Sequence, residues 1–225
     1  MLAQGLTVKN PLLPWWRNAP EHWIYPLQTL VCGGLLLAWH RHYRLAPWRG
    51  IGLAALLGAV SIALWILPGW LGEQWRAAGA LPQSWWEYAG LNPRLEGFDP
   101  TLSAGHPMVH ALEIFFRFLR MVVVVPLVEE LFWRSFLMRF LVARGERDFT
   151  QIPFGTHTWP AYFGTTLAVV LIHSPADWLG AFIFGSMIYW LAVRTRSLAA
   201  CVLMHAVANL ILGLYVMSTG KWGYW

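Results

Sequence analysis

The sequence has little charge and almost no cysteine. Charged residues make up 12% of its 225 residues and there are two cysteines, whereas 57% of the residues are hydrophobic and 16 are tryptophan. About one quarter of the residues in an ordinary soluble domain are charged, so the composition excludes that class and indicates an integral membrane protein. Cys32 and Cys201 lie in apolar runs, which favours small buried side chains over a disulfide or a metal site.

Basic runs interleaved with aromatic residues are also missing, so we expect no nucleic-acid partner. The net charge of +5 fits the basic cytoplasmic loops of a membrane protein better. No repeat, linker or low-complexity tract divides the chain, and residues 1–225 are therefore predicted to form a single integral membrane domain.

Long apolar runs predict an all-α fold, a polytopic transmembrane helical bundle of about six to eight membrane helices, some of them broken or half-length. We expect spans at 22–39, 51–70, 107–140, 161–173, 178–193 and 198–217. The third run is too long for one straight crossing, and Pro126 predicts a break or kink within it. In the second run, small residues such as Gly52 and Gly58 predict close helix packing.

Arginines gather on two of the connections between these spans. Arg41, Arg44 and Arg49 follow the first span without an acidic residue, and Arg194 and Arg196 follow the fifth. Cytoplasmic loops carry an excess of Lys and Arg. We therefore place both connections inside a cell membrane, either the inner or the plasma membrane, and the N-terminus outside.

Two adjacent carboxylates, Glu129 and Glu130, lie inside the apolar stretch 122–139. On a helix, Glu130 and Arg134 are four residues apart and share a face, whereas Glu129 points about 100° away from its neighbour. A charge at membrane depth costs about 2.5–3.5 kcal/mol or more and by default marks a functional site. We expect Arg134 to hold Glu130 and Glu129 to be free for chemistry.

Three further polar residues lie in later apolar runs: His173, His205 and Asn209. The last two are four residues apart and project from one helix face. Such groups can satisfy one another in a polar cavity inside the bundle. A carboxylate with an imidazole can activate a water, and a second imidazole with an amide can donate to an oxyanion. The set predicts peptidase-like chemistry without a Ser or Cys nucleophile.

The arrangement resembles the CAAX protease and bacteriocin-processing family of intramembrane proteases (CPBP/Abi). Its three motifs are matched in order by Glu129, Glu130 and Arg134 (EExxxR), by His173 (FxxxH), and by His205 with Asn209 (HxxxN). Val169 stands where the second motif has Phe. The resemblance covers a catalytic core at about 107–217. HExxH, GxSG and GxGD motifs, which mark other intramembrane proteases, are absent.

The resemblance implies a glutamate-dependent endopeptidase that cuts a peptide or a lipidated protein C-terminus near the surface of the lipid bilayer. The implied roles are water activation by Glu129 with His173, an oxyanion site from His205 with Asn209, and structural support from Glu130 with Arg134.

Several alternatives stay open. Glu129, His173 and His205 offer a carboxylate and two imidazoles that can bind zinc, although we favour a site without metal because the Asn209 amide is better suited to an oxyanion. The same fold also suits a non-catalytic membrane scaffold, immunity protein or accessory protein. A compact, Trp-rich chain of this kind further resembles the prenyl-protease-related proteins of exosortase sorting systems, which makes that sorting machinery a candidate partner.

Overall fold

The computed structural model describes residues 17, 20–95, 97–145 and 148–225. The N-terminal segment that we place outside the membrane falls largely in the residues that it does not describe. Across the described ranges the chain forms helices and short helical turns and no strand. The predicted all-α helical bundle is confirmed.

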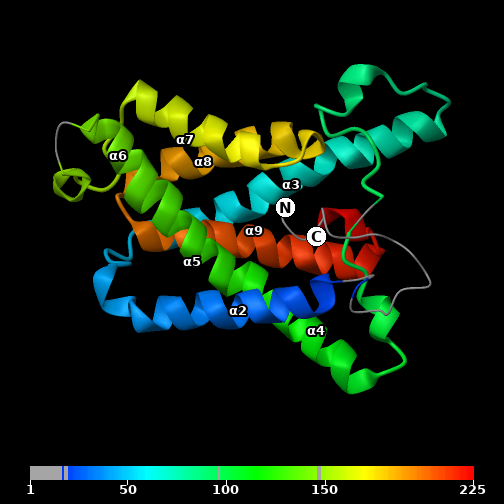
Figure 1. The fold of residues 1–225 in the computed structure, drawn as a ribbon. Helices are drawn as coiled ribbons and strands as arrows, with labels where there is room; N and C mark the ends of the chain where they lie inside the picture. Colours follow the sequence, from blue (N-terminus) through cyan, green and yellow to red (C-terminus); the bar gives the residue numbers. More distant parts are fainter. Residues whose placement is uncertain (1–16, 18–19, 96, 146–147) are drawn as a thin grey trace.

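Within the residues that the structure describes, five separate helices and one long composite helix make up the bundle, and Figure 1 shows their arrangement. The separate helices are α2 (Glu21–Ala38), α3 (Ile51–Ala77), α7 (Trp159–Ile172), α8 (Trp178–Thr195) and α9 (Leu198–Thr219). Among the described helical segments, three are long and apolar enough to cross a membrane, namely Ile51–Ala77, Pro175–Thr195 and Leu198–Thr219. The expected total of about six to eight spans stays a prediction.

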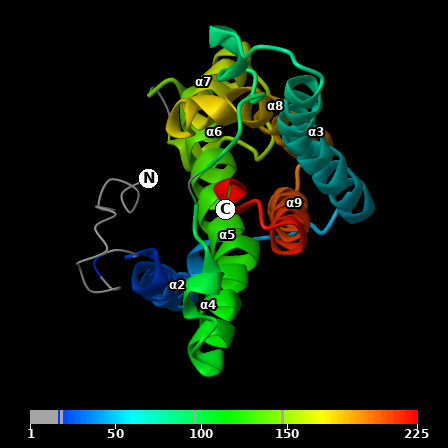
Figure 2. The same ribbon diagram turned by 90° about the vertical axis from the view of Figure 1, so that its right-hand side faces the viewer.

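The composite helix crosses the bundle obliquely and links α2 on one side to α7 on the other (Figures 1 and 2). It consists of α4 (Pro107–Leu119), α5 (Val125–Glu130) and α6 (Met138–Ala143), joined by π-helical stretches at Arg120–Val124 and Leu131–Leu137. At 1.5 Å per residue it is about 55 Å long, well beyond one straight crossing of a bilayer.

Pro126 does not break this helix, so the expected break is wrong, whereas the alternative of a kink stays a prediction. The π-helical stretch immediately before it shifts the hydrogen bonding by one residue, so that the N–H of Val125 donates to the carbonyl of Arg120, five residues back. Proline has no N–H and crowds the preceding turn, and a π turn is one of the adjustments that absorb such an insertion. The chain therefore stays helical through Pro126.

The apolar core lies toward the end of the bundle that holds the arginine-bearing connections after α2 and α8. We call this the basic end. The core is built from the first turns of α3, α7 and α9, the last turns of α8, and α6. Its fully buried members are Ala54, Met138, Ala161, Ile188, Leu191, Ala192, Ala200, Cys201 and Met204. Protein interiors built from fully buried side chains leave few voids larger than a water molecule. This end of the bundle is therefore closed.

Two arginine-bearing connections meet at the basic end. The connection after α2 is hydrogen-bonded to the connection before α9, because the N–H of Ala199 donates to the carbonyl of Leu45 at 3.1 Å and the Ser197 hydroxyl donates to the carbonyl of Pro47. The arginines of the two connections predict that both lie on the same side of the membrane, and in the fold the two connections touch.

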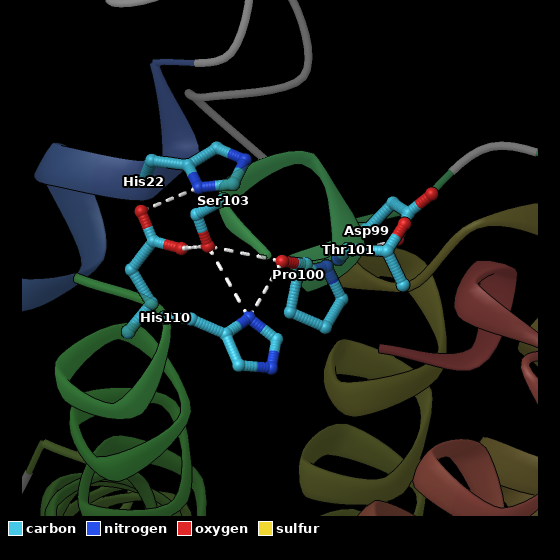
Figure 3. Close-up of polar contacts among 7 residues, drawn as sticks. His22, Asp99, Pro100, Thr101, Ser103 and His110 are labelled. Atoms are coloured by element: carbon cyan, nitrogen blue, oxygen red, sulfur yellow. Dashed lines mark hydrogen bonds and ion pairs between the residues drawn. The ribbon is translucent and has the colours of Figure 1, made fainter. Parts of the chain in front are cut away.

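A polar cluster fastens the start of α2 to α4 at the opposite end of the bundle, which we call the far end (Figure 3). His22 Nδ1 donates to the Glu113 carboxylate at 2.7 Å, and the Ser103 hydroxyl donates to the other oxygen of that carboxylate. Beside them, His110 Nδ1 donates to the carbonyl of Pro100 at 2.9 Å. His22, Ser103 and Glu113 are buried, so the cluster acts as a polar fastening between two helices.

The two glycines that predicted close packing in α3 behave differently. Gly58 is buried, and a Cβ at that position would lie 2.6 Å from the backbone oxygen of Met204 and 3.0 Å from the Cβ of Val207, both on α9. A Cβ at Gly52 would meet nothing within 4 Å. The packing prediction is therefore confirmed for Gly58 and wrong for Gly52, which lies near the start of the helix.

We expect Gly58→Ala to destabilise the protein by about 1–3 kcal/mol, the usual cost of overpacking, although alanine is the better helix former. Gly52→Ala is the matched control and is expected to leave stability unchanged or to raise it by up to about 1 kcal/mol. Thermal unfolding in detergent micelles measures both. Equal effects from the two substitutions would contradict the α3–α9 contact.

Candidate active site

A cavity of about 560 Å³ lies at the far end of the bundle, beyond the apolar core. All six of the side chains singled out from the sequence line it: Glu129, Glu130, Arg134, His173, His205 and Asn209. They come from the composite helix, from the end of α7 and from α9. The fold thus brings together residues that lie far apart in the sequence.

Glu130 is the most deeply buried member of the set, with none of its surface exposed. One carboxylate oxygen, Oε2, lies 3.3 Å from Arg134 Nε, so the predicted pairing of these two residues is present. The other, Oε1, accepts a hydrogen bond from His205 Nδ1 at 2.9 Å. Because an unpaired buried carboxylate is costly, this double contact explains how the charge is tolerated.

His205 is therefore joined to the glutamate that sequence analysis assigned to structure. Its ring also packs edge-on against Phe184 at 5.2 Å, and only 8% of its surface is exposed. Since Nδ1 is engaged by Glu130, Nε2 is the ring nitrogen that remains for a ligand in the cavity.

Asn209, one turn after His205 on α9, donates from its side-chain amide to the backbone carbonyl of Met121 at 2.6 Å. In a regular helix that carbonyl would accept from residue 125, but the Val125 N–H donates to Arg120 instead. Residue 126, the π-helical donor, is a proline and has no N–H. Asn209 supplies the missing donor, and its amide keeps a second N–H.

His173 caps the C-terminal end of α7, where the chain becomes extended. Its Nδ1 donates to the carbonyl of Val169 at 2.7 Å. A carbonyl only accepts, so Nδ1 carries the hydrogen and Nε2 of the neutral ring keeps its lone pair. The bond uses the backbone of residue 169, so the departure from Phe to Val in the family motif leaves it intact.

Glu129 lies half-buried in the cavity wall. Within the described ranges of the chain, no hydrogen bond joins its carboxylate to another side chain, in contrast to its neighbour Glu130. Arg120, one π-helical stretch earlier, is the cation that acts on it electrostatically. The two glutamates thus differ as their helix positions predicted: Glu130 is held and Glu129 is free.

A second ionic group forms the outer wall of the cavity, and sequence analysis missed it. Arg94 donates to Asp177 Oδ1 from Nε at 3.0 Å and from Nη2 at 2.8 Å. The same oxygen accepts from the Trp65 indole at 3.2 Å, and the Trp65 ring packs edge-on against the His173 imidazole at 5.5 Å. The position of Asp177, four residues after His173, was the one signal available in the sequence.

The zinc alternative requires Glu129, His173 and His205 to converge on one ion. Over the described part of the chain, no three His, Cys, Asp or Glu side chains are gathered as the ligands of a metal ion would be. Glu130 engages His205 Nδ1 and Val169 engages His173 Nδ1, so a metal would have to use the Nε2 atoms. Both the metal-free site and the zinc alternative stay predictions.

Comparison with known families supports the resemblance read from the motifs. The model of type II CAAX prenyl endopeptidases, Rce1-like, matches residues 111–211. This segment contains all six site residues and falls within the catalytic core expected at about 107–217, so the resemblance to the CAAX protease family is confirmed. No curated protein and no solved structure matches the chain significantly.

We expect the contact between Asn209 and Met121 to be coupled to Pro126. Asn209→Ala leaves the Met121 carbonyl without its donor and should cost about 1–3 kcal/mol of stability. In a Pro126→Ala background, residue 126 regains an N–H five residues beyond Met121, so the same substitution should cost less. The free energies of unfolding of the wild type, the two single variants and the double variant, measured in detergent, give the coupling energy between the two positions. Strictly additive costs would contradict this account of the π-helical stretch.

Proposed function

Because residues 111–211 match the Rce1-like CAAX prenyl endopeptidases, we propose that this protein is a glutamate-dependent intramembrane endopeptidase. The observation that carries the proposal is the convergence of Glu129, His173, His205 and Asn209 on one cavity within an apolar bundle. Ionisable groups inside a membrane protein mark functional sites, and these four are types that hydrolysis of a peptide bond requires.

Water activation is assigned to Glu129 and His173. The free carboxylate of Glu129 and the Nε2 lone pair of His173 line the same cavity and are both proton acceptors. A water held between them would lose a proton to one of them while its oxygen attacks the carbonyl carbon of the substrate. The proton then passes to the leaving nitrogen as the peptide bond breaks, so the site returns to its starting state.

Stabilisation of the oxyanion is assigned to His205 and Asn209. With Nδ1 donating to Glu130, His205 can also donate from Nε2 only as the imidazolium. In that form Glu130, Arg134 and His205 together carry one net positive charge, which suits a site that must stabilise a developing negative oxygen. The second N–H of Asn209 is the other donor.

The substrate is proposed to be a peptide or a lipidated protein C-terminus cut close to the membrane surface, by analogy with CAAX prenyl endopeptidases. Apolar side chains in the cavity lining, including Ile62, Trp133 and Phe184, suit such a chain. We place the protein in the cell membrane, inner or plasma, as a multi-pass protein with its N-terminus outside, on the basis of the arginine-bearing connections. The exosortase-type sorting machinery stays a candidate partner.

Glu129→Gln removes the proposed base and keeps the shape of the side chain. We expect turnover to fall by about 10²–10⁴-fold, the usual contribution of a general base. The assay uses purified protein in detergent with a fluorogenic farnesylated peptide that ends in a CAAX sequence, and with its unprenylated counterpart.

Glu87→Gln is the matched control, because Glu87 is exposed and lies outside the cavity lining. It should turn over substrate like the unmodified protein. Wild-type cleavage that survives Glu129→Gln would exclude the proposed role of this carboxylate, and wild-type protein that cuts neither peptide would count against a CAAX-type specificity.

A site that uses only side chains should not depend on metal. We expect turnover to be unchanged after dialysis against a strong zinc chelator and metal analysis to find less than one zinc per chain. If chelation abolished turnover and zinc restored it, Glu129, His173 and His205 would be reassigned as zinc ligands.

A further inference from the structure

We propose that the cavity is entered from the outer face of the membrane, so that the substrate is a polypeptide exposed outside the cytoplasm, such as an exported or outwardly anchored chain. The inference rests on the proposed function and adds to it the compartment in which the substrate is met. Three observations carry it: the loops that wall the cavity, the position of the apolar core, and the distribution of charge between the two ends of the bundle.

The parts of the cavity wall that lie outside α3, α7, α8, α9 and the composite helix all belong to the far end. They are contributed by Pro93, Arg94 and Leu95, by Ser174, Ala176 and Asp177, and by Gly223, Tyr224 and Trp225. These three segments follow the C-terminal ends of α3, α7 and α9, which run from the basic end to the far end. None of the described residues in the connections at the basic end lines the cavity.

The apolar core closes the opposite route. It fills the space between α6, the first turns of α3 and α9, and the last turns of α8. Its members include Ile188, Leu191 and Met204, none of which has exposed surface. On α9, Met204 immediately precedes His205, so the packed core ends where the cavity begins. Close-packed protein interiors leave few voids larger than a water molecule, so these buried side chains leave a peptide no route to the cavity from the basic end.

The charge of the connections differs between the two ends. Among the described residues, the connections at the basic end and the last turn of α8 carry Arg41, Arg44, Arg49, Arg144, Arg194 and Arg196 against Asp148. The far end, including the last turns of α3, carries Arg17, Arg76, Arg94 and Lys221 against Glu73, Glu87, Asp99 and Asp177. Since cytoplasmic connections are the ones enriched in Lys and Arg, the basic end faces the cytoplasm.

The three connections at the basic end also form one surface. The connection after α2 is hydrogen-bonded to that before α9, and a Cβ at Gly155, in the connection before α7, would lie 3.2 Å from the Arg196 side chain. They therefore share one side of the membrane. The cavity, at the far end, consequently faces away from the cytoplasm.

Cysteine labelling in intact cells tests the orientation of the full chain directly. In a Cys32→Ala background, single substitutions are made at the cavity wall (Leu95→Cys and Ser174→Cys) and at the basic end (His42→Cys and Gln151→Cys). All four positions are exposed, and Cys201 can stay because it is fully buried. The probe is a membrane-impermeant sulfonated maleimide.

We expect the two cavity-wall cysteines to react in intact cells and the two at the basic end to react only after permeabilisation. The reverse pattern would overturn the proposal, and so would labelling of all four in intact cells, because that requires both orientations. The labelling does not depend on peptidase activity, so it decides the orientation even if the proposed function fails.

A cleavage assay tests the outward orientation of the cavity separately from the peptidase activity. The probe is a sulfonated, membrane-impermeant version of the fluorogenic CAAX peptide, added to right-side-out and to inside-out membrane vesicles. We expect cleavage in right-side-out vesicles to exceed that in inside-out vesicles at least tenfold, and detergent to abolish the difference. Cleavage confined to inside-out vesicles would overturn the outward orientation and leave the peptidase standing, whereas no cleavage even in detergent would count against the peptidase alone.

Discussion

The buried carboxylate of Glu130 is the constraint on which the site depends. None of its surface is exposed, so its charge must be met inside the bundle by Arg134 on its own helix and by His205 on α9. An uncompensated charge at this depth costs several kcal/mol. The composite helix and α9 are therefore held in one register, which places His205 Nε2 and the Asn209 amide beside the cavity.

The irregular geometry of the composite helix contributes a second fastening between the same two elements. The π-helical stretch directs the Val125 N–H to the Arg120 carbonyl and Pro126 has no N–H, so neither usual helical donor serves the Met121 carbonyl, and Asn209 donates to it instead. A buried carbonyl without a partner is unfavourable, so the defect in one helix and the amide on the other stabilise each other. π-helical turns are frequent at functional sites, and here one creates a contact between helices.

The bundle divides its interior between a packed end and a hollow end. Small and aliphatic side chains close the basic end, whereas the far end holds the cavity and is bordered by the Arg94–Asp177 pair. Trp65 connects this border to the end of α7, because it donates to Asp177 and packs against the His173 ring. The cavity and the polar groups that line it are thus concentrated at one end.

Composition and local spacing were enough to predict an all-α membrane bundle, the pairing of Glu130 with Arg134, and six of the residues that line the cavity. These features depend on average hydrophobicity and on neighbours within one helical turn. Long-range contacts were beyond that information: His205 meets Glu130 across 75 residues, Arg94 meets Asp177 across 83, and Trp65 meets Asp177 across 112. The reason is that such partners are chosen by how helices pack, and packing also decided that Gly58 touches α9 while Gly52 does not.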